Sequence, residues 1–127
     1  MEKLLFTEEE FIENYDHEID LAVEVYGRMS GNGFQNNALC AFDFDFSSDK
    51  KEKLQPLGKL LNDDYGFNLS KIRKEGKFWV LEGTSPEQPY NEERLLYWAL
   101  DLYSKGYQFD CRLTGYGGVI DPHQLDF

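Results

Sequence analysis

The stretch that decides the fold is "ALCAFDFDFSS", Ala38 to Ser48, in which aromatic and acidic residues alternate. A period of two is the pattern of a β-strand with one face in the core and the other in water. The even-numbered positions from Cys40 to Phe46 are therefore expected on the core side. Asp43 and Asp45 are expected on the opposite face, where the role of two carboxylates has to be explained.

The residues after this strand alternate between helical and extended patterns. Leucines at spacings of three and four predict a helix that ends at "DDYGF", and Lys74-Glu75-Gly76 lies between two strand-like runs as in a hairpin. Asn91 is a helix cap, and we expect its helix to end at Gly106. The run "YQFDCRL" predicts a last strand over residues 107–113, and "GYGG" predicts a turn. The order β-α-β-β-α-β is that of a ferredoxin-like α+β fold with a four-stranded antiparallel sheet.

An additional helix precedes this core. Thr7 and Glu10 have the spacing of a capping box, in which each side chain accepts a hydrogen bond from the backbone of the other. An apolar periodicity follows, and Gly27 predicts the end of the helix. We therefore expect one domain over residues 1–127, composed of an N-terminal helix at 8–26, a ferredoxin-like core at 38–118 and an irregular tail at 119–127.

The usual strand order of this fold makes the first and last strands neighbours. Cys40 and Cys111 are then expected in the core as small buried residues. Asp43, Asp45 and Asp110 are expected to share the open face of the sheet, with Arg112 nearby.

The charge balance of the chain argues against some classes of function. The chain has 24 acidic and 13 basic residues and a net charge of −11, so nucleic acid should repel it. Residues 1–30 carry a net charge of −7, which favours a basic protein partner, although acidity that only maintains solubility explains it equally well. No apolar run reaches membrane-spanning length, and the first residues do not resemble a signal peptide, so a bacterial-type cytoplasm is the expected location.

Three carboxylates on one sheet face are also a candidate site for Mg²⁺ or Mn²⁺ in a metal-dependent enzyme. Acids on the wet face of a half-buried strand are common, however, and Arg112 is placed to neutralise one of them. His17 and His123 lack converging ligands, and no nucleophile motif is present. "GYGG" precedes no helix start that would bind phosphate. We therefore expect no cofactor and no metal.

Several segments in order resemble the regulator of ribonuclease activity B family, the ribonuclease E inhibitor proteins. These segments are "FDFDF", a helix ending in "YGF", "KFWVLEGTS", "KGYQFD" and "GYGG", between about Asn37 and Gly118. The family closes its last strand with a Tyr-Asp-Gly-Trp-like segment, of which only the aromatic-Asp pair Phe109-Asp110 is present here. The resemblance implies a ferredoxin-like fold and an acidic, non-enzymatic protein that binds a ribonuclease and restrains RNA cleavage.

The sequence therefore predicts a cytoplasmic, non-catalytic protein that binds a basic protein partner, with a nuclease as the expected partner. One alternative is an immunity protein that neutralises a nuclease toxin, and another is a metal-dependent enzyme that uses the three aspartates. The sequence does not indicate an oligomeric state. The expected partner-binding residues are Asp43, Asp45 and Asp110 on the sheet and Glu10, Glu13, Asp20 and Glu24 on the first helix.

Overall fold

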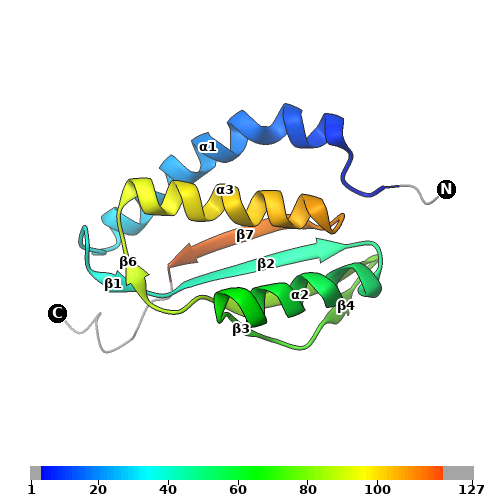
Figure 1. Cartoon of the computed structure of the whole chain (residues 1–127). Helices are drawn as coiled ribbons and strands as arrows, with labels where there is room; N and C mark the ends of the chain where they lie inside the picture. Colours follow the sequence, from blue (N-terminus) through cyan, green and yellow to red (C-terminus); the bar gives the residue numbers. More distant parts are fainter. Residues whose placement is uncertain (1–3, 119–127) are drawn as a thin grey trace.

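The computed structural model describes residues 4–118, so the expected tail at 119–127 and His123 lie outside the described residues. Its helices and strands are an α+β set in the expected order, with a long helix at the start (Figure 1). The helices are α1 (Glu8–Gly31), α2 (Lys51–Tyr65) and α3 (Glu92–Gln108). The strands are β1 (Leu39–Cys40), β2 (Phe42–Ser48), β3 (Asn68–Leu69), β4 (Arg73–Glu75), β5 (Phe78–Thr84), β6 (Gln88–Pro89) and β7 (Arg112–Gly118).

The main sheet has the strand order β3-β5-β2-β7, with β4 also paired to β5, and all its pairings are antiparallel. This is the ferredoxin-like order, so the prediction that the first and last core strands are neighbours is confirmed. The hairpin is confirmed as well, since β4 and β5 join through a two-residue loop in which Gly76 has φ 60°. β1 and β6 form a small separate ribbon.

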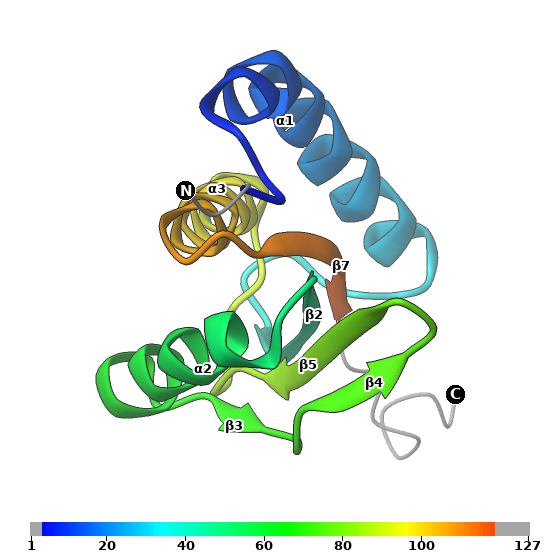
Figure 2. The same cartoon turned by 90° about the vertical axis from the view of Figure 1, so that its right-hand side faces the viewer.

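Two helices cover one face of the sheet. α2 and α3 lie side by side on this face, and α1 lies past the β7 edge, against α3 (Figure 2). The aromatic side of β2 faces these helices, as the alternation predicts. Phe44 and Phe46 pack with the leucines of α2 in one core cluster, and Phe42 packs with Val25 and Met29 of α1 in a second.

α1 begins where the sequence predicts and ends later. The capping box between Thr7 and Glu10 is formed. The helix continues through Gly27 to Gly31, so its predicted end at residue 26 was wrong. Gly27 faces solvent, and a Cβ added there would have no heavy atom within 4 Å. Val25 and Met29, by contrast, are buried. Burial of these flanking apolar side chains outweighs the weak helix propensity of one exposed glycine.

The boundary between α3 and β7 also differs from the prediction. α3 continues past Gly106 to Gln108, and β7 begins only at Arg112, so residues 107–111 are not a strand. Gly106 serves close packing rather than helix termination, because a Cβ there would lie 2.7 Å from the Cys111 carbonyl oxygen. "GYGG" belongs to β7 and is not a turn.

Candidate functional site

The open face of the sheet, opposite α2 and α3, carries the two aspartates of β2. Asp43 pairs with Gly117 of β7, and Asp45 pairs with Gly115. Because glycine has no side chain, neither of these two β7 residues places a side chain over the carboxylates. A Cβ at Gly115 would lie 3.1 Å from Asp45 Oδ1, and one at Gly117 would lie 3.7 Å from Asp43 Oδ1. Gly117 therefore leaves the exposed Asp43 carboxylate open toward the β7 edge, whereas the half-buried Asp45 carboxylate lies close over Gly115.

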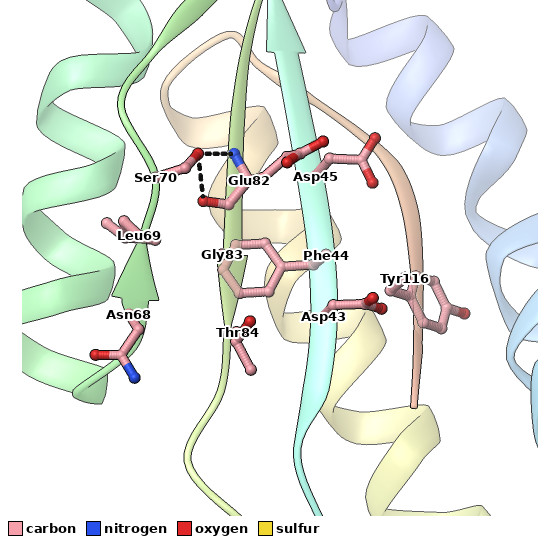
Figure 3. Close-up of a pocket in the computed structure, with 10 residues that line it drawn as sticks. All are labelled: Asp43, Phe44, Asp45, Asn68, Leu69, Ser70, Glu82, Gly83, Thr84 and Tyr116. Atoms are coloured by element: carbon pink, nitrogen blue, oxygen red, sulfur yellow. Dashed lines mark hydrogen bonds between the residues drawn. The ribbon is translucent and has the colours of Figure 1, made fainter. Parts of the chain in front are cut away.

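β5 borders the aspartates on the other side. Asp43 pairs with Thr84 and Asp45 pairs with Glu82, and these side chains line an open depression together with Asn68 and Ser70 (Figure 3). Glu82 is only partly available, because Arg73 Nη2 donates a 2.8 Å hydrogen bond to its Oε1. Arg73 therefore neutralises Glu82 in this depression and does not pair with either aspartate.

The two aspartates differ in their surroundings. Burial raises the pKa of Asp43 above its usual value, and the neighbouring charges of Asp45 and Glu82 add to the effect. Asp45 accepts a 2.8 Å hydrogen bond from the hydroxyl of Thr114, which sits in an irregularity of β7 between Asp45 and Phe46. Both side chains lie on the open face, as predicted.

Asp110 does not lie on that face, so this part of the prediction was wrong. It occupies the turn before β7 with a left-handed φ of 58° and is buried. Its carboxylate accepts hydrogen bonds of 2.8 and 2.7 Å from the backbone amides of Leu5 and Phe6, and it pairs with Lys53. Asp110 therefore fastens the N-terminal segment to the end of α3 and is unavailable to a partner.

Glu10 also has an internal partner. Its carboxylate receives hydrogen bonds from Arg112 and from the Thr7 backbone amide. The bond from Arg112 is the main reason why the pKa of Glu10 lies below its usual value. Arg112 therefore joins β7 to α1 instead of neutralising an aspartate of the open face. Its Nη2 also donates to the Leu5 carbonyl oxygen at 2.7 Å.

The outer side of α1 carries the remaining predicted acids. Glu13, Asp20 and Glu24 are exposed, and none has an ion pair or side-chain hydrogen bond within residues 4–118. Glu9 and Asp16 lie on the same side and were missed, although the helical period that selected the other three also selects them. We call this set the acidic row: Glu9, Glu13, Asp16, Asp20 and Glu24.

α1 leaves the open face uncovered. It packs on α3 and on the edge strand β7, and Asp43 remains exposed beside it. In the view onto the open face, α1 lies to one side of β7 (Figure 3). The molecule therefore presents two acidic surfaces, one on the sheet and one on the first helix.

One acid of α1 is buried, which the sequence pattern did not predict. Glu18 is 8% exposed, and its Oε2 has no hydrogen-bond partner in the described part of the chain. Burial raises the pKa of Glu18 above its usual value. The Tyr116 hydroxyl and Trp98 Nε1 are likewise buried without a partner there. The helical period could have found this residue, because Glu18 lies four positions before Ala22 and seven before Val25, which are both buried.

The described residues offer no metal centre and no reactive thiol. Within residues 4–118, no three His, Cys, Asp or Glu side chains are placed to hold a metal ion together. Asp110 is separated from the aspartates of the open face, so the three residues of the metal alternative do not form one site. Cys40 and Cys111 are buried as predicted, and burial raises the pKa of Cys111 to about 12.

Neither a scan against protein-family models nor a search of curated proteins finds a match to this chain. In the part of the chain that the structure describes, no helix has the length and apolar character needed to cross a membrane.

Proposed function

We propose that this protein is a non-enzymatic, cytoplasmic binding protein that docks onto a basic protein partner and restrains it. The observation that supports this proposal best is the acidic row. Its five carboxylates point outward from one helix, and none is neutralised by a described residue. Such a surface attracts lysine and arginine side chains and increases the rate of encounter with a basic protein.

The open face supports the same proposal. Asp43 is exposed beside Gly117, whose lack of a side chain leaves room for a long cationic side chain to reach this carboxylate across β7. The sequence resemblance implies a nuclease as the partner. A nuclease suits an acidic binding protein because its RNA-binding surface must be basic. Covering that surface would exclude RNA without any chemistry by this chain.

Purified chain and ribonuclease E provide the test. We expect saturable binding that weakens with added salt, together with slower cleavage of a single-stranded RNA substrate. A variant with Glu13→Lys, Asp20→Lys and Glu24→Lys should lose both effects. A matched variant with Glu52→Lys, Asp64→Lys and Glu93→Lys makes the same change in net charge at exposed sites on α2 and α3.

The two variants separate a defined surface from net charge alone. Retained binding by the matched variant together with loss by the α1 variant supports the acidic row. Equal losses would mean that no particular surface is used. Absence of binding at low salt, with cleavage unchanged at a large excess of the chain, would reject ribonuclease E as the partner.

A further inference from the structure

α1 carries exposed apolar side chains beside the acidic row. Ile12 is 64% exposed and Val23 is 49% exposed, and Ile19 between them is half-buried. Large exposed apolar side chains on a helix otherwise surrounded by carboxylates are unfavourable in water. The described residues leave Ile12 and Val23 uncovered.

The spacing of these residues defines a line along the helix. Ile12, Asp16, Ile19 and Val23 are separated by four, three and four positions, which is the repeat of a coiled-coil seam. At 100° per residue they fall within one narrow sector of α1, on the border between the acidic row and the side that packs on α3. We call these four residues the seam. Side chains with this repeat can pack against those of a second helix that has the same repeat.

Charge decides what kind of helix fits. α1 has eight acids and one arginine, so a second copy of this chain would bring two acidic rows together. A basic helix would instead pair with the acidic row on one side of the seam. Asp16 lies within the seam itself, where a polar residue fixes register and requires an oppositely charged partner opposite it.

We infer that α1 docks an amphipathic, basic helix of a protein partner, whose apolar residues pack on Ile12, Ile19 and Val23 and whose lysine or arginine meets Asp16. This inference rests on the proposed function and specifies the form of its partner. It assigns the apolar contact to the seam and the electrostatic attraction to the acidic row. The open face of the sheet is not required for it.

Two synthetic peptides test the inference. The first has three heptads, with leucine at the first and fourth positions of each heptad except for one lysine at the central seam position that faces Asp16, and with lysine or alanine elsewhere. The second has the same composition in an order that forms no apolar stripe. We expect the full chain to bind the heptad peptide at least about tenfold more tightly than the scrambled one at low salt. Amide chemical-shift changes should lie along α1 and not at Asp43 and Asp45.

Variants of the chain locate the contact. Ile12→Ser with Val23→Ser should reduce binding of the heptad peptide to the level of the scrambled one. Tyr97→Ser is the matched control, because Tyr97 is 63% exposed on α3, away from the seam, and its loss should change nothing. Asp16→Lys should weaken binding, and a heptad peptide with glutamate at the facing position should restore it.

The possible outcomes separate the inference from the function on which it rests. Equal binding of both peptides by the unaltered chain overturns the seam and leaves attraction to a basic partner intact. An equal loss in the Tyr97 control, or shift changes confined to the open face, also overturns it. If neither peptide binds at low salt, the acidic row does not attract basic chains and the proposed function fails as well.

Discussion

At the scale of single residues, the carboxylates of this protein have three different roles. Those of the acidic row face water, Asp110 is fully engaged in hydrogen bonds and an ion pair, and Glu18 is buried without a described partner. The sequence does not distinguish them by type, since all are acids in polar-looking contexts. Their effects on stability should therefore differ in sign.

Glu18→Gln is expected to stabilise the protein. It removes a carboxylate charge that burial disfavours and whose Oε2 has no described hydrogen-bond partner, and the gain near neutral pH should be on the order of 1 kcal/mol. The folded state raises the Glu18 pKa and therefore favours the protonated carboxyl. The stability that this protonation contributes is present at low pH and is lost as pH rises through the folded-state pKa. The gain from the variant should therefore shrink as pH falls toward the ordinary value of 4.5.

Urea unfolding of the two proteins at several pH values measures this effect. Glu13→Gln is the control, since Glu13 is exposed on the same helix and its replacement should change little. A loss of stability in Glu18→Gln near neutral pH would show that the charged form of Glu18 has a stabilising partner.

Asp110→Asn should destabilise the protein by about 1–3 kcal/mol. Asparagine tolerates the left-handed backbone at this position, so the change isolates the ion pair with Lys53 and one acceptor oxygen. Asp49→Asn removes the other, more exposed partner of Lys53 and should cost less. Denaturant unfolding of both variants gives the comparison, and equal costs would contradict an anchoring role for Asp110.

At the scale of elements, the two unexpected helix ends are explained by glycines in different surroundings. Gly27 faces open space, whereas Gly106 is pressed against the Cys111 carbonyl and the ring of Phe46. Neither ends its helix, because a helix ends where packing and capping favour it and not merely where glycine occurs.

The two glycines provide a matched pair of substitutions. Gly106→Ala should destabilise the protein by about 1–3 kcal/mol, since its methyl group would lie 2.9 Å from a Phe46 ring carbon and 2.7 Å from the Cys111 oxygen. Gly27→Ala should stabilise it by about 0.5–1 kcal/mol through reduced backbone freedom in the unfolded chain. Thermal unfolding should move in opposite directions, and a shift of the same sign in both would refute this explanation.

The same elements show what sequence reasoning can reach. β2 and its faces follow from alternation within eleven residues, and the capping box of α1 follows from Thr7 and Glu10 alone. The strand order follows from the order of the elements. Asp110 was misplaced because its position depends on Leu5, which lies 105 residues away, and on Lys53, which lies 57 residues away. No local pattern contains such contacts.

The candidate site likewise has residues that local periodicity predicts and residues whose surroundings depend on distant parts of the chain. The exposure of Glu13, Asp20 and Glu24 follows from helical periodicity, and that of Asp43 and Asp45 follows from strand alternation. The partner of Glu10 does not follow from a local pattern, because Arg112 lies beside Glu10 only when β7 is paired with β2.

At the scale of the whole molecule, charge is unevenly distributed. α1 carries a net charge of −7, whereas residues 47–82 have eight basic and six acidic residues. The association rate with a lysine-rich peptide should therefore fall by at least about tenfold as the Debye length is reduced from about 30 Å to about 3 Å with salt. Stopped-flow fluorescence measures this rate, and a rate independent of salt would contradict electrostatic steering by α1.

The anchoring of the N-terminal segment has a consequence for the order in which the chain assembles. Leu5 and Phe6 are synthesised before their acceptor Asp110, which lies more than a hundred residues later in the chain. During synthesis, α1 therefore cannot dock until α3 and β7, the elements against which it packs, have been made. In pulse-labelled hydrogen exchange during refolding, we expect the amides of Leu5 and Phe6 to gain protection after those of β2 and β5, and earlier protection would contradict this order.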